Sequence, residues 1–121
     1  MPKKILVADD DHGYLTMMQK LLGERGFDVV TAADGEEAYR LAHSLKPDLI
    51  LLDVDMPKMD GDELYMILKE KDAPTKDIPV LIVTGLRTEK DLEKSGDPDI
   101  IAKPVHIDQL LLKIKGMIGG V

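Results

Sequence analysis

Five polar residues stand at the ends of short aliphatic runs in this sequence, and their side chains have the chemistry of a phosphate site. They are Asp9, Asp10, Asp53, Thr84 and Lys103. Carboxylates held close together repel one another unless a cation joins them. Mg²⁺ is the expected cation, because it prefers oxygen ligands and keeps several waters. A hydroxyl and an ammonium group suit an anion, so the five together could hold a phosphoryl group beside Mg²⁺.

The run that leads into Asp53 indicates how these side chains are positioned. Residues 49–52 are four large aliphatic residues in succession. Such a run is typical of a strand buried on both faces, and strands of that kind belong to parallel sheets. Four similar runs predict four more strands, at residues 5–8, 29–32, 80–83 and 100–102.

Apolar residues at helical spacing alternate with these runs and predict five helices. The stripes are Leu15, Met18, Leu21 and Leu22; Ala38, Leu41, Ala42 and Leu45; Leu64, Ile67 and Leu68; Leu92 alone; and Leu110, Leu111, Ile114, Met117 and Ile118. Asp34 and Asp60 are each followed by Glu three residues later, a pattern typical of a helix N-terminus. The fourth helix, between Thr88 and Gly96, has the weakest pattern.

Strands that alternate with helices predict a parallel sheet with helices on both faces. We expect an α/β, flavodoxin-like (βα)5 three-layer sandwich with strand order 2-1-3-4-5, built from residues 1–121 as a single domain. In this topology the first and third strands are neighbours, so Asp9, Asp10 and Asp53 converge at the carboxyl edge of the sheet. Aspartate can act as a phosphoryl acceptor, and the central position of Asp53 favours it for that role.

Composition excludes several classes of protein. The formal net charge of -7 argues against a nucleic-acid-binding surface, which needs a basic patch. The chain has no cysteine, which fits a reducing, cytoplasmic location. No apolar run approaches membrane-spanning length, and none resembles a signal peptide. We therefore expect a cytoplasmic domain that binds neither nucleic acid nor membrane.

The whole constellation resembles the receiver domain of two-component response regulators, including the single-domain chemotaxis type. Four motifs carry the resemblance, in order and at the expected strand ends. They are Ile-Leu-Val-Ala-Asp-Asp-Asp at 5–11, Leu-Leu-Asp-Val-Asp-Met-Pro-Lys-Met-Asp-Gly at 51–61, Ile-Val-Thr-Gly at 82–85 and Ala-Lys-Pro at 102–104. Each motif alone would be weak, but the set is specific and spans the chain.

The resemblance implies a role for each acid. Asp53 would accept a phosphoryl group from a sensor histidine kinase or a phosphotransfer protein. Asp10 and Asp53 would bind Mg²⁺ directly, together with the backbone carbonyl of Asp55, and Asp9 would act through a water molecule. Such a protein is not an enzyme in the usual sense, because it catalyses only its own phosphorylation and dephosphorylation.

The resemblance also implies how phosphorylation is read. Lys103 would pair with the phosphoryl oxygens, and Thr84 would move to hydrogen-bond the phosphoryl group. The family usually has an aromatic switch residue where this chain has Ile100, which has no hydroxyl group. No output domain is expected on this chain, so the signal would pass to an unknown output protein, with the receiver as a monomer or weak dimer.

Two other functions are compatible with parts of this pattern. The segment Asp53-Val54-Asp55 is similar to the nucleophile motif of haloacid dehalogenase-type phosphohydrolases. In those enzymes, however, the motif normally follows the first strand, and here it follows the third. The other alternative is a pseudo-receiver that binds partners without phosphorylation. Ile100 motivates it, as does a fourth helix that is shorter than is common in the family.

Overall fold

Five parallel strands form one sheet at the centre of the molecule, as the sequence predicts. The structure is a computed structural model that describes residues 2–53, 61–84, 100–102 and 105–119. The strands are β1 (Lys4–Ala8), β2 (Asp28–Ala32), β3 (Leu49–Asp53), β4 (Val80–Thr84) and β5 (Ile100–Ala102). Their order is β2-β1-β3-β4-β5, and every neighbouring pair is parallel. The predicted strand order is therefore confirmed.

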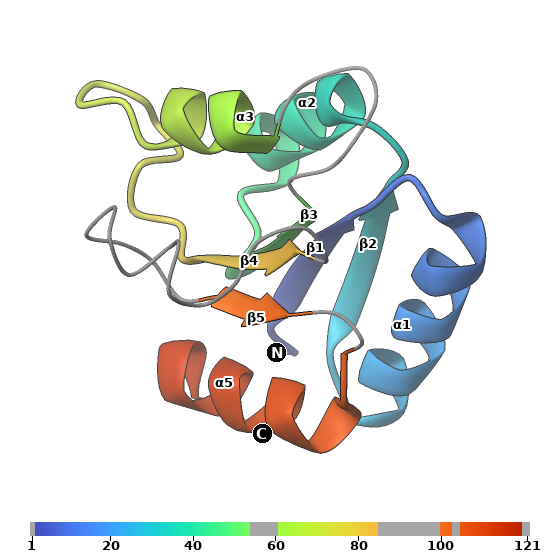
Figure 1. Ribbon diagram of the computed structural model, residues 1–121. Helices are drawn as coiled ribbons and strands as arrows, with labels where there is room; N and C mark the ends of the chain where they lie inside the picture. The colour runs from blue at the N-terminus through green and yellow to red at the C-terminus, as the bar shows by residue number, and fades with distance from the viewer. Residues whose placement is uncertain (1, 54–60, 85–99, 103–104, 120–121) are drawn as a thin grey trace.

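Helices cover both faces of the sheet. They are α1 (His12–Glu24), α2 (Gly35–Leu45), α3 (Gly61–Leu68) and α5 (Ile107–Ile118). Figure 1 shows α2 and α3 on one side of the sheet and α1 and α5 on the other. The fourth predicted helix lies at residues 85–99, outside the described residues, as does the predicted cap at Asp60. Within the described ranges, no helix is both long enough and apolar enough to cross a membrane.

The helix starts follow the predicted capping chemistry. The Asp34 side chain accepts a hydrogen bond of 2.9 Å from the backbone N–H of Glu37, which caps α2. The Glu37 carboxylate in turn accepts a 2.9 Å hydrogen bond from the N–H of Ala33. Side chains thus satisfy two backbone donors at the start of the helix. These hydrogen bonds fix where α2 begins after β2.

The central strand β3 is completely buried, and the core lies on both of its faces. Leu52 packs in a cluster on the side of α2 and α3, while Leu51 packs in a second cluster on the side of α1 and α5. The apolar stripe that ends at Leu45 lies in α2, as predicted, but Leu45 itself is 38 % exposed at the last residue of that helix.

Candidate functional site

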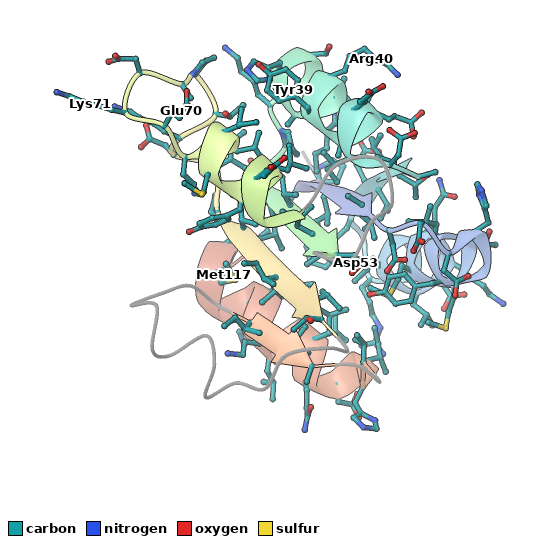
Figure 2. The ribbon with its side chains drawn as sticks, turned by 45° about the horizontal axis from the view of Figure 1, so that its top comes forward. Tyr39, Arg40, Asp53, Glu70, Lys71 and Met117 are labelled. Carbon is teal, nitrogen blue, oxygen red and sulfur yellow. The ribbon has the colours of Figure 1, made fainter. Side chains whose placement is uncertain are left out.

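The carboxyl edge of the sheet brings three acidic side chains together. Asp53 is the last residue of β3, and Asp9 directly follows β1, the neighbouring strand. One carboxylate oxygen from each of Asp9, Asp10 and Asp53 lies within 4.8 Å of the other two. Figure 2 shows Asp53 at the end of β3, on the side where α1 begins. The predicted convergence of these three acids is confirmed.

The acids differ in their exposure to solvent. Asp9 is fully buried and Asp53 is 2 % exposed, whereas Asp10 is exposed. We call this group the acid pocket, in which Asp9 and Asp53 are the buried members and Asp10 is the exposed one.

Local hydrogen bonds hold the turn that carries Asp9. Its backbone N–H donates to the carbonyl oxygen of Ala32 at 3.0 Å, which extends the pairing of β1 with β2. Its Oδ1 atom accepts a 3.0 Å hydrogen bond from the N–H of Asp11. The Asp11 side chain accepts a 3.1 Å hydrogen bond from the N–H of Tyr14 and caps α1. The start of α1 and the orientation of Asp9 are thus fixed by one turn.

Thr84 lies at the same edge of the sheet as the acid pocket. It is the last residue of β4, directly after Val83, which pairs with Asp53 in register, and its side chain is buried. Ile100 is 6 % exposed at the start of β5, and it packs in the cluster on the side of α2 and α3. The remaining predicted site residues, Asp55 and Lys103, lie outside the described residues.

Tyr14, in the first turn of α1, was not among the predicted site residues, but its charge environment relates it to the acids. Its hydroxyl oxygen is inaccessible to solvent. Burial raises the pKa of Tyr14 well above its ordinary value, and the negative charges of Asp9 and Asp53 raise this pKa further.

The donor set of the acid pocket fits Mg²⁺. All three side chains offer carboxylate oxygens, which are the hard ligands that this ion prefers. Their mutual repulsion in a mostly buried place is relieved by a bound dication. The described part of the pocket contributes neither histidine nor cysteine to the ligand group, so its chemistry differs from that of a typical zinc site.

Known proteins are similar to this chain in fold and in sequence. Residues 5–115 match the family described as the response regulator receiver domain. The chain is 39 % identical to the alkaline phosphatase synthesis transcriptional regulatory protein PhoP of Bacillus subtilis, over 98 % of this chain and 49 % of PhoP. It thus spans about half the length of this curated relative.

Solved structures of receivers resemble the chain over nearly its full length. The receiver domain of Francisella response regulator 1452 has a TM-score of 0.85 and 33 % identity, with 96 % of each chain covered. Chemotaxis protein CheY4 of Vibrio cholerae has a TM-score of 0.85 and 28 % identity, covering 97 % of this chain and 99 % of CheY4. The chain therefore belongs to the response regulator receiver domain family of two-component systems.

Proposed function

We propose that this receiver accepts a phosphoryl group on Asp53 with Mg²⁺ bound in the acid pocket. The observation that carries the proposal is the approach of three carboxylates to within 4.8 Å at the end of β3. The sequence alternative of a haloacid dehalogenase-type hydrolase finds no support, because the chain matches the receiver family over residues 5–115.

The chemistry assigned to Asp53 is a nucleophilic displacement at phosphorus. A carboxylate oxygen of Asp53 forms a bond to the phosphorus of a phosphohistidine, the phosphorus–nitrogen bond breaks, and the histidine nitrogen keeps the electron pair. Water later attacks the acyl phosphate and releases inorganic phosphate, which restores the carboxylate. Because Asp53 is almost buried and Asp10 is exposed, we expect the donor to approach from the side of Asp10.

The acid pocket supplies ligands for the metal. Asp10 and Asp53 would bind Mg²⁺ directly, with the backbone carbonyl of Asp55, and Asp9 would contribute through a water molecule. The burial of Asp9 behind Asp10 supports a less direct role for Asp9. When bound, Mg²⁺ neutralises charge that would otherwise repel the incoming phosphoryl group.

The new charge would be sensed by residues on the adjacent strands. Thr84, which is buried at the end of β4, would donate its hydroxyl proton to a phosphoryl oxygen, and Lys103 would pair with the same group. A phosphoryl group shifts a conformational equilibrium only by its difference in contacts between two states. We infer that Ile100 follows Thr84 through packing alone, because its side chain is apolar and buried in the core.

The partners proposed here follow from the receiver family. Receivers interact with histidine kinases and with output domains or proteins. Among the relatives, PhoP is a transcriptional regulatory protein, and CqsS of Vibrio cholerae is an autoinducer sensor kinase/phosphatase. We propose that a histidine kinase or phosphotransfer protein donates the phosphoryl group to this chain, and that a protein partner reads the result in the cytoplasm.

Incubation with acetyl phosphate tests the acceptor function without knowledge of the kinase. Intact mass spectrometry is expected to show one added phosphoryl group in the presence of Mg²⁺ and none in EDTA. Asp53→Asn is expected to remain unmodified, whereas Asp72→Asn, at an exposed position in the loop after α3, should behave as wild type. The absence of any adduct on the folded wild-type protein would favour the pseudo-receiver alternative.

A further inference from the structure

Asp11 connects the start of α1 to Asp9, a fully buried member of the acid pocket. Its backbone N–H donates a hydrogen bond of 3.0 Å to Asp9 Oδ1. Its own Oδ1 atom accepts a hydrogen bond of 3.1 Å from the N–H of Tyr14, in the first turn of the helix. The backbone of Asp11 is extended, with φ -90° and ψ 106°, as is usual for an N-cap residue. One exposed residue thus contacts both the helix and a buried acid.

The cap determines where the backbone N–H of Asp11 lies. Its carbonyl oxygen accepts from the N–H of Leu15 at 3.0 Å, and its side chain accepts from the first turn as well. These two hydrogen bonds hold Asp11 against the helix, so its N–H keeps one direction, towards Asp9 Oδ1. The backbone N–H of Asp9 in turn donates to the carbonyl oxygen of Ala32 at 3.0 Å. Asp9 is therefore held at its backbone by β2 and at its side chain by Asp11.

Position 13 leaves space for the capping carboxylate. A Cβ atom at Gly13 would lie 3.3 Å from Asp11 Oδ1, which is closer than an ordinary van der Waals contact. Any larger residue would therefore displace the oxygen that caps α1. Glycine is less favourable than alanine in a helix, and at this position the undisturbed cap offsets that disadvantage.

We propose that Asp11 is a positioning residue for Mg²⁺ binding: by capping α1, it keeps its backbone N–H on Asp9 Oδ1 and so orients the Asp9 carboxylate in the acid pocket. Groups that hydrogen-bond the ligands of a metal hold them in the geometry that the metal needs, and their loss weakens binding. Mg²⁺ is demanding in this respect, because it requires nearly ideal octahedral geometry. The inference rests on the proposed function, since it assumes that the acid pocket binds this ion.

The charge-matched variants Asp11→Asn and Asp11→Ala test the proposal. Both remove the same negative charge, but asparagine can still cap a helix, whereas alanine cannot. Isothermal titration of each full chain with MgCl₂, at a temperature where circular dichroism shows it to be folded, measures the Mg²⁺ dissociation constant. The constant of Asp11→Ala is expected to be roughly fivefold that of Asp11→Asn. This is less than the tenfold or more lost with the partner of a ligand, because the backbone N–H remains.

A second measurement follows the hydrogen bond to Asp9 without the metal. In EDTA, NMR measures how fast the amide of residue 11 exchanges with water, corrected for the intrinsic rate of each sequence. This amide is expected to exchange faster in Asp11→Ala than in Asp11→Asn, because an N–H that no longer donates to Asp9 is less protected. The amide of Leu110, which donates to the carbonyl oxygen of His106 at 3.0 Å at the start of α5, is the control and should be unchanged.

The outcomes separate this inference from the proposed function. If wild type binds Mg²⁺ and the two Asp11 variants bind it equally well, the positioning role is overturned while the proposed function stands. The role is also overturned if Asp11→Ala binds more weakly but its residue 11 amide exchanges as in Asp11→Asn. If folded wild type binds no Mg²⁺, the proposed function and the inference both fail. Weaker binding together with faster exchange in Asp11→Ala supports the inference.

Gly13→Ala replaces Asp11→Ala if the latter does not fold. This variant keeps the charge of Asp11 and crowds its Oδ1 atom with a new Cβ, so wild type is its reference. Weaker Mg²⁺ binding and faster exchange of the residue 11 amide than in wild type are expected. Binding and exchange equal to those of wild type would overturn the proposal.

Discussion

At the scale of single residues, the three carboxylates of the acid pocket repel one another. Asp9 and Asp53 are buried, and Asp10 brings a third carboxylate oxygen within 4.8 Å. Two unit charges at such a distance interact by about 3 kcal/mol at an effective dielectric constant near 20. A chain that keeps this arrangement gives up stability in its metal-free form, which is typical of residues retained for function.

Removing one of these charges is expected to stabilise the metal-free protein. In EDTA, Asp53→Asn should raise the free energy of unfolding by about 1–3 kcal/mol, because one repulsive partner becomes neutral. Urea denaturation measures this difference, and Asp72→Asn is the exposed control. In saturating Mg²⁺ the advantage should shrink, because wild type gains about 1.4 kcal/mol at a Mg²⁺ concentration tenfold above its dissociation constant. Lower stability of Asp53→Asn in EDTA would count against this account.

Titration of Tyr14 is expected to lower the stability of the folded protein at alkaline pH. Its pKa is raised in the folded state, while an unfolded tyrosine titrates near pH 10. Above about pH 10 the unfolded state therefore releases a proton that the folded state keeps, so stability falls as pH rises towards the folded pKa. In EDTA, Tyr14→Phe should lack this loss, which amounts to at most about 1.4 kcal/mol per pH unit. Urea denaturation at several pH values from 9 to 11 tests this, and parallel curves for the two proteins would contradict it.

At the scale of elements, the starts of the helices determine how the strands connect to them. The cap of α2 is the clearest case, because Asp34 accepts from the N–H of Glu37 at 2.9 Å and Glu37 accepts from the N–H of Ala33. Two side chains thus satisfy donors that would otherwise lack a partner within the helix.

Asp34→Ala is expected to lower the free energy of unfolding by about 1 kcal/mol, the typical cost of losing an N-cap side chain. Glu36→Ala is the matched control, since Glu36 is exposed in the same turn and only its favourable interaction with the helix dipole is lost. Thermal or urea denaturation of both variants provides the comparison. An equal loss in the two variants would show that charge, not the hydrogen bond, stabilises this helix start.

The elements also show what could be predicted from the sequence and what could not. Aliphatic runs at 5–8 and 80–83 marked β1 and β4 within one residue, because fully buried strands need continuous apolar side chains. Helical spacing placed Leu45 in a helix correctly, but it did not show that this last residue of α2 is 38 % exposed. Tyr14 was missed for a related reason, since a pattern of apolar residues says nothing about where a hydroxyl group lies.

At the scale of the whole molecule, we expect stability to be greatest around the strand that carries Asp53. β3 is buried throughout and has a core cluster on each face, whereas β2 forms an edge of the sheet and is only partly buried. The proposed phosphoryl acceptor would thus lie on a part of the fold that opens rarely.

Native-state hydrogen exchange is expected to show this gradient. The N–H of Ile50 in β3 donates to the carbonyl oxygen of Pro79 at 3.0 Å, and the N–H of Asp28 in β2 donates to that of Lys3 at 2.9 Å. Both amides are hydrogen-bonded, so their difference in exchange reports opening of the structure. The Ile50 amide should exchange only through global unfolding and the Asp28 amide faster. Similar rates for the two would contradict the gradient.

Chemical trapping can identify the phosphoryl acceptor, which we propose to be Asp53. The chain is incubated with acetyl phosphate and Mg²⁺ and then reduced with borohydride, which converts an aspartyl phosphate to homoserine. Tandem mass spectrometry locates the modified residue. If Asp53 is the acceptor, homoserine is expected at position 53, dependent on Mg²⁺, with Asp9 and Asp10 unmodified. Homoserine at another aspartate, or none in a protein that carries a phosphoryl group, would contradict it.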